Sequence, residues 1–118
     1  MTIALLGVLI GAVLGGLGLF APRRALAFVG LTTASSEGLG EVRATYGGLF
    51  LVLELSAGYV WLGRHDTAAM LAVGLAWVGA AIGRSLSVVV DGGRTPKNIA
   101  GVAFEAVTGA LHLLALVG

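Results

Sequence analysis

The sequence contains no cysteine, which excludes disulfides, thiolate catalysis and cysteine-ligated metals. Charged residues make up 11% of the 118 residues, against about 25% in soluble domains. So few charges could not cover the surface of a soluble fold of this size. Aromatic residues are sparse at 7% and the formal net charge is only +1. Neither a base-stacking platform nor a basic stripe is therefore expected, and we predict no nucleic-acid partner.

Hydrophobic residues are what the sequence has instead, at 58% of the chain with a mean hydropathy of +1.01. They gather into four runs, each long enough to cross a hydrocarbon layer of about 30 Å at about 1.5 Å per helical residue. The sequence therefore predicts an all-α fold, an integral membrane antiparallel four-helix bundle. We expect one transmembrane domain over residues 1–118, with helices at about 2–20, 41–62, 68–90 and 98–117.

Positive charge is unevenly divided between the loops. The first and third loops share one side and carry four cations, against one cation in the second loop; these are Arg23, Arg24, Arg94 and Lys97, and Arg64. Because Lys and Arg favour the cytoplasmic side, we expect the first and third loops in the cytoplasm. Both termini would then lie outside, and the expected location is the plasma membrane.

The linker after the first run has two readings. Residues 23–30 could lie along the cytoplasmic interface as an amphipathic turn or two, or form an irregular loop. Ala25-Leu26-Ala27 resembles a signal-peptide cleavage site. No Lys or Arg precedes the apolar run, however, and the run is long for a signal sequence, so we expect it to be retained.

Small residues recur at helical spacing in two runs. Gly7, Gly11 and Gly15 repeat every four residues in the first, which lets transmembrane helices approach closely. This face would serve packing within the chain or the seam of a homodimer. The third run has a matching set, which we expect to pack in the same way: Ala72, Ala76 and Ala80 on one line, Gly79 and Gly83 on another.

Polar side chains within the spans are costly, so each is a candidate for function. On three of the helices they share faces by their spacing. The candidate ligand-binding residues are Arg43, Tyr46, Glu54, Trp77, Arg84, Asp91, Glu105 and His112. Glu54, Glu105 and His112 are the catalytic candidates, because an acid in apolar surroundings suits proton donation and a histidine beside it suits proton relay. We predict no metal site and no cofactor.

Depth along each helix decides which of these could meet. Arg84 and Glu105 lie about 10 Å and 12 Å from the cytoplasmic boundary, which predicts an ion pair. Glu54 and His112 lie deeper, at about 20 Å and 22 Å, which allows a hydrogen bond. Arg43, near the cytoplasmic start of its helix, could reach Asp91 or Glu105.

The favoured function is binding of a lipid-like or isoprenoid-like amphipathic molecule, whose anionic head would meet Arg43 and Arg84. One alternative is a structural or accessory subunit of a membrane complex, with the cluster as interhelical glue. Another is an oligomeric proton-coupled transporter. Catalysis stays open. If the level of Glu54 and His112 held a ligand, a cavity would line it, and Glu54→Gln would abolish binding with little effect on folding.

The run Glu41-Val-Arg-Ala-Thr-Tyr-Gly-Gly-Leu-Phe, with Glu54 later in the same helix, resembles the signature of an uncharacterised bacterial family, domain of unknown function 4345. Gly83-Arg84, Val90-Asp91-Gly92 and Glu105 are similar to that family's third and fourth helices. The resemblance covers most of the chain. It implies a four-helix membrane fold and no established activity.

Overall fold

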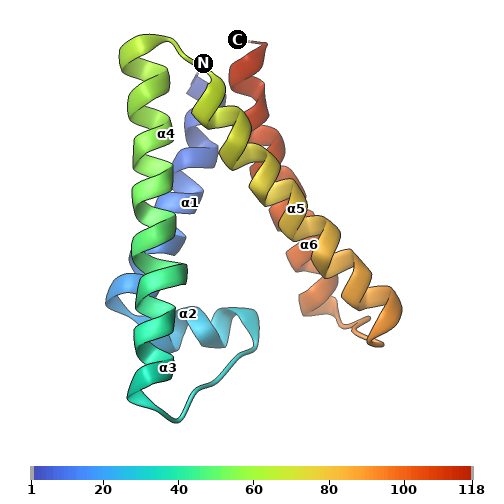
Figure 1. Cartoon of the computed structure of the whole chain (residues 1–118). Coiled ribbons are helices and arrows are strands. Elements are labelled where there is room, and N and C mark those ends of the chain that lie inside the picture. Colours follow the sequence, from blue (N-terminus) through green and yellow to red (C-terminus); the bar gives the residue numbers. More distant parts are fainter. Residues whose placement is uncertain (1, 118) are drawn as a thin grey trace.

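The computed structural model describes residues 2–117, and these are almost entirely helical (Figure 1). None of the described residues lies in a strand. In chain order the elements are α1 (Thr2–Phe20), α2 (Pro22–Val29), α3 (Ser36–Glu41), the π-helix η1 (Val42–Leu49), α4 (Phe50–Arg64), α5 (Ala68–Val90), α6 (Pro96–Leu113) and the 3₁₀ turn η2 (Leu114–Leu116).

Four helical segments are long and apolar enough to cross a membrane: Ile3–Phe20, Ser36–Arg64, Ala68–Val90 and Pro96–Leu116. Large apolar side chains also cover their outward faces. Leu9, Val52 and Ile82, from three of the segments, are 58%, 62% and 65% exposed. Such surfaces are stable against lipid and not against water, so composition and surface agree on a membrane protein.

The predicted ends of the first and third helices are confirmed, whereas the second begins earlier than residue 41. Ser35 is the reason, because its side chain accepts a hydrogen bond from the Gly38 amide at 3.0 Å and caps the helix there. The α6 start also follows a cap. Thr95 accepts from the Asn98 amide at 3.1 Å, and Pro96 occupies the first turn.

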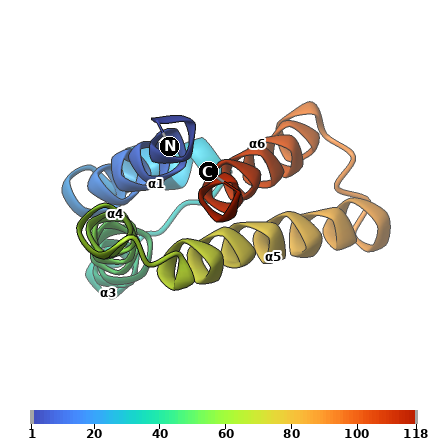
Figure 2. The ribbon, with the colours of Figure 1, turned by 90° about the horizontal axis from the view of Figure 1, so that it is seen from above.

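The helices are arranged as two antiparallel pairs, α1 with α4 and α5 with α6 (Figures 1 and 2). Both termini lie at one end, where the pairs meet, and the pairs diverge toward the other (Figure 1). The molecule is a flattened wedge of 43 × 32 × 17 Å. The two pairs therefore pack against each other at only one end, and at the other end the molecule is more open than a closely packed four-helix bundle.

The end with the termini holds the apolar core. Its buried residues are contributed by α1, α4, α5 and the C-terminal turn: Ala4, Val8, Ala57, Trp61, Met70 and Ala115. We call this the closed end, and the opposite end the open end.

The glycine face of α1 is filled by contacts within the chain. A Cβ on Gly7 would lie 2.7 Å from His112 Nδ1, and one on Gly15 would lie 2.6 Å from the Leu51 backbone nitrogen. A Cβ on Gly11 would collide with the Glu54 carboxylate. The stripe thus serves packing within the chain. A homodimer seam through Gly7, Gly11 and Gly15 would have to displace these contacts.

The matching set on the third span does not pack against another helix of this chain. A Cβ on Gly79 or Gly83 would meet nothing within 4 Å, and Ala72, Ala76 and Ala80 are exposed. Other glycines bring α5 and α6 together: a Cβ on Gly109 would lie 2.9 Å from the Gly74 carbonyl oxygen. Sequence spacing identified small residues correctly but could not tell which helix face has a neighbour.

Two further elements occupy the open end. Residues 22–29 form the helix α2, the ordered one of the two alternatives for this linker, and it ends at Gly30 in the left-handed conformation with φ +80°. The π-helix η1 lies against the end of α1, where a Cβ on Gly47 would come within 2.6 Å of the Leu19 amide. Both elements therefore pack beside the diverging helices.

Candidate functional site

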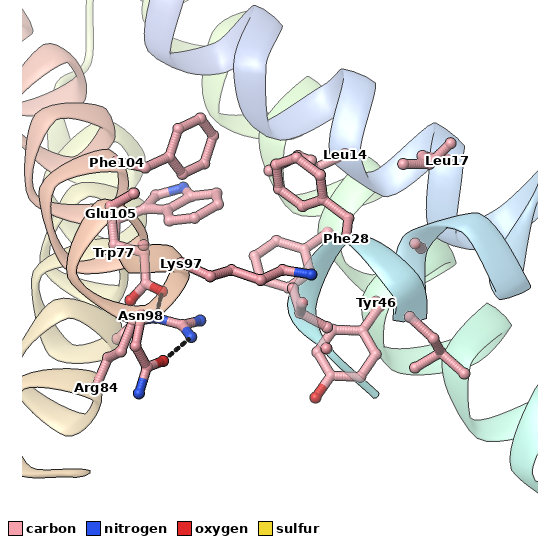
Figure 3. Close-up of a pocket in the computed structure, with 18 of the residues that line it drawn as sticks. Leu14, Leu17, Phe28, Tyr46, Trp77, Arg84, Lys97, Asn98, Phe104 and Glu105 are labelled. Atoms are coloured by element: carbon pink, nitrogen blue, oxygen red, sulfur yellow. Dashed lines mark hydrogen bonds and ion pairs between the residues drawn. The ribbon is translucent and has the colours of Figure 1, made fainter. Parts of the chain in front are cut away.

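A cavity of about 750 Å³ opens between the two helix pairs at the open end (Figure 3). We call it the cleft. Its walls come from α1, α2, η1, α4, α5 and α6, so it depends on the divergence of the pairs. The lining residues used below are Leu14, Leu17, Phe28, Tyr46, Phe50, Trp77, Ala80, Arg84, Lys97, Asn98, Gly101, Phe104 and Glu105.

Apolar and aromatic side chains make up most of the cleft wall. The Trp77 ring contacts Phe50 and Phe104, with ring centroids 5.5 Å and 6.2 Å apart. Leu14 and Leu17 of α1 face Trp77 and Phe104 from the other helix pair (Figure 3). Such a surface suits an apolar chain.

Polar groups gather at one edge of the cleft. Arg84 Nε donates to Glu105 Oε1, which confirms the predicted ion pair. Arg84 Nη1 also donates to Asn98 Oδ1 at 3.1 Å, and Asn98 Nδ2 donates to the Gly93 carbonyl at 3.0 Å. These bonds hold the arginine against α6. Glu105 Oε2 is buried and has no hydrogen-bond partner.

A second cation crosses the cleft. Lys97 Nζ donates to the Ala27 carbonyl at 2.7 Å, and its side chain extends from α6 toward α2 (Figure 3). Phe28 and Phe104 meet edge-on beside it, with centroids 6.5 Å apart and planes at 72°. These two contacts tie α2, which packs against α1, to α6 of the other helix pair.

The deeper predicted pair is also confirmed. His112 Nε2 lies 2.7 Å from Glu54 Oε2, and Trp77 Nε1 donates to Glu54 Oε1 at 2.9 Å. His112 Nδ1 lies 2.8 Å from the Thr108 carbonyl oxygen. Glu54 and His112 are both 0% exposed. The network joins α4, α5 and α6.

Hydrogen bonding fixes the proton count of this network. The Thr108 carbonyl can only accept, so His112 Nδ1 must carry a proton. One further proton is then shared between Nε2 and the Glu54 carboxylate. The pair is neutral overall wherever that proton lies, which makes its full burial tolerable. This arrangement lets Glu54 and His112 satisfy each other without water.

Neither Glu54 nor His112 lines the cleft. Gly7 and Gly11 of α1 press on them directly, and Trp77 separates them from the cavity, since it borders the cleft and bonds to Glu54. The structure therefore has close packing, and not a cavity, around Glu54 and His112. Room for a ligand lies instead beside Arg84 and Glu105.

Arg43 and Asp91 do not join the cluster, and the predicted reach of Arg43 to Asp91 or Glu105 was wrong. Arg43 Nη1 donates to the Leu19 carbonyl. The last carbonyls of a helix lack partners within it and attract cations, so the end of α1 competes successfully for this arginine. Asp91 is exposed at the end of α5. Tyr46, in contrast, lines the cleft.

Comparison with known proteins identifies the family. The model for domain of unknown function (DUF4345) matches residues 1–116. The chain belongs to this family. No curated protein and no solved structure matches this DUF4345 chain. Within residues 2–117, no group of three or more His, Asp and Glu side chains could hold a metal ion.

Sequence reasoning about this DUF4345 protein missed several residues of the cleft, chiefly Lys97, Asn98 and Phe104. A signal for two of them was available. Lys97, Gly101, Phe104 and Glu105 follow i, i+4, i+7, i+8 spacing and share one face of α6. Lys97 was read only as an orientation signal, and Phe28 could not be found because no spacing relates α2 to α6.

Proposed function

We propose that this DUF4345 protein is a multi-pass protein of the plasma membrane that binds a lipid-like amphipathic molecule in the cleft. One observation carries the proposal: a cavity of about 750 Å³ has mostly apolar walls and a cluster of polar groups, Arg84, Asn98 and Glu105, at one edge. Ligand sites typically measure about 300–1,000 Å³ and combine apolar walls with a few fixed polar groups. An apolar chain would lie along the walls, and its polar end would reach the edge.

Within this proposal the candidate residues divide by position. Tyr46 and Trp77 would contact the apolar chain, and Arg84 and Glu105 the polar end. Lys97 adds a cation at the same cleft. Arg43 and Asp91 lie outside it, so they would not contact the ligand.

The alternatives draw less support from the geometry. A proton-coupled transporter using Glu54 and His112 needs water at those groups, yet both are fully buried. An accessory subunit needs no cavity, so the cleft would have no role in it. In an accessory subunit, the polar residues would matter chiefly for stability.

The first experiment asks whether an amphiphile occupies the cleft. Native mass spectrometry of the protein purified from membranes should detect a one-to-one adduct whose mass matches none of the detergents used. Ala80→Phe fills the cleft from α5 and should remove the adduct. Ala76→Phe is the matched control, because Ala76 lies one turn away and is exposed like Ala80 but does not line the cleft. A wild type without adduct, or an Ala80→Phe protein that keeps it, would contradict the proposal.

The second experiment asks which side each end of the molecule faces. Because the chain lacks cysteine, Ser36→Cys and Gly63→Cys each create a single thiol, at the open and closed ends respectively. The four-to-one distribution of Lys and Arg between loops predicts that the open end faces the cytoplasm. An impermeant reagent should then label only Gly63→Cys in intact cells, and labelling of Ser36→Cys would reverse the orientation.

A further inference from the structure

Glu105 lines the cleft, and one of its carboxylate oxygens has no hydrogen-bond partner. Its side chain is only 6% exposed, and Oε1 accepts from Arg84. Oε2 is buried without a partner, and the residue lines the cavity. A buried acceptor left unpaired is costly, and nearly all such groups in folded proteins find a donor. The cleft therefore favours a molecule that supplies an N–H or O–H group at Oε2.

Charge at the cleft selects among the donors. Arg84 already neutralises Glu105, and Lys97 adds a further cation with a backbone carbonyl as its partner. An ammonium head would thus enter a site that already carries excess positive charge. A carboxylate or phosphate dianion would be attracted by this positive charge, but it brings no proton for Oε2 and would be repelled at that oxygen. A neutral hydroxyl meets both conditions, since it donates one hydrogen bond and accepts another.

We propose that the ligand is a neutral amphiphile with a hydroxyl head, a long-chain alcohol by chemical class, whose O–H donates to Glu105 Oε2. The proposal rests on the cleft being a ligand site and names the chemistry of that ligand. The apolar chain lies against Trp77 and Phe104. A hydroxyl head replaces the anionic head expected from the sequence, because Arg43 bonds to the end of α1 and Arg84 is already paired with Glu105.

Tryptophan fluorescence can report on the cleft directly. The chain has two tryptophans. Trp61→Phe leaves Trp77, which lies in the cavity wall, as the sole tryptophan. The probes are four hexadecyl amphiphiles with dibrominated chains: the alcohol, its methyl ether, the carboxylate and the primary amine. Each is titrated into the protein in detergent micelles, and quenching that Ala80→Phe abolishes is counted as binding in the cleft.

The alcohol should bind about tenfold more tightly than the methyl ether, which lacks only the donor. It should also bind more tightly than the amine and the carboxylate. In the double variant Arg84→Met with Glu105→Met, the alcohol and the ether should bind alike. If that variant does not fold, the four probes on the wild-type cleft still decide, because their comparison needs no substitution at the polar edge.

Each contrary result points to a different error. Equal binding of alcohol and ether would overturn the hydroxyl assignment and leave the cleft as a ligand site. Tighter binding of the amine or the carboxylate would overturn the neutral head. If none of the four probes gives quenching that Ala80→Phe abolishes, the proposed function itself is overturned. If Trp61→Phe unfolds the protein, the same series is scored on the unsubstituted chain by native mass spectrometry.

Discussion

Two buried glutamates, Glu54 and Glu105, differ in how completely their carboxylates are hydrogen-bonded. Glu54 at the closed end has partners on both oxygens, Trp77 and His112. Glu105 at the open end has Arg84 on one oxygen and nothing on the other. The same side chain is thus fully satisfied where four helices meet and half satisfied where they diverge. The comparison teaches that a polar residue in a membrane helix is structural or available according to its neighbours, not its type.

Glycine on α1 accounts for much of this contrast. Gly7 and Gly11 let α1 close over His112 and Glu54, which excludes water and ligand from that level. At the open end α2 and the diverging helix pairs leave a cavity instead. Each of the following substitutions should affect one end more than the other.

The largest effect is expected for Glu54→Leu. It removes the acceptor from both Trp77 and His112, and loss of one partner from a buried pair costs about 3–5 kcal/mol. Unfolding followed by circular dichroism in mixed micelles should show this as a lowered free energy of unfolding. A Glu54→Leu protein as stable as wild type would mean that the network contributes nothing to folding.

Glu54→Gln should be far milder, within about 1 kcal/mol of wild type. The amide oxygen can accept from Trp77, and the amide nitrogen can donate to His112 Nε2 while Nδ1 still donates to Thr108. Since Glu54 lies outside the cleft, the adduct seen by mass spectrometry should persist, in contrast to the loss expected for a ligand-binding Glu54. Loss of the adduct in a stable Glu54→Gln protein would return Glu54 to the site.

Gly15→Ala tests the close approach of α1 and α4. The new methyl would lie 2.6 Å from the Leu51 amide nitrogen, and overpacking typically costs about 1–3 kcal/mol. Gly16→Ala is the matched control, because its methyl meets nothing within 4 Å and alanine favours helix by up to about 1 kcal/mol. The two variants should therefore shift thermal stability in opposite directions, and equal shifts would contradict the α1–α4 contact.

Glu105→Gln should cost about 1–3 kcal/mol, less than Glu54→Leu. Arg84 loses its carboxylate, but its side chain is 29% exposed and keeps the bond to Asn98. The double variant Arg84→Met with Glu105→Met should recover much of the loss. A double variant no more stable than the sum of the single changes Glu105→Met and Arg84→Met would mean that the two side chains are not coupled.

The effect of Lys97→Met on stability should be as small as that of Glu54→Gln, about 1 kcal/mol or less, since one hydrogen bond at an exposed site is removed. The change should instead appear locally, as faster hydrogen exchange in α2. Arg94→Met is the control, because Arg94 is an exposed cation in the loop just before Lys97. Equal exchange in the two variants would show that Lys97 does not hold α2.

Much of the fold was already predictable from the sequence. The ends of α1 and α5 followed from the apolar runs, because these features depend on residues close together in the chain. Depth along the helices also predicted two side-chain pairs, since the rise per residue is constant. These are the ion pair of Arg84 with Glu105 and the hydrogen bond of Glu54 with His112.

The sequence by itself determined the membrane class, the helices and the levels at which polar side chains lie. Only the tertiary structure decided which level is open. Depth says nothing about the angle between helix pairs, so it could not show that α1 closes over Glu54 or that the cleft lies beside Glu105. Nor could depth show that Arg43 bonds to the end of α1, or that Lys97 and Phe28 line the same cavity. These contacts join segments whose relative placement is set by side-chain packing, and local sequence patterns carry no record of it.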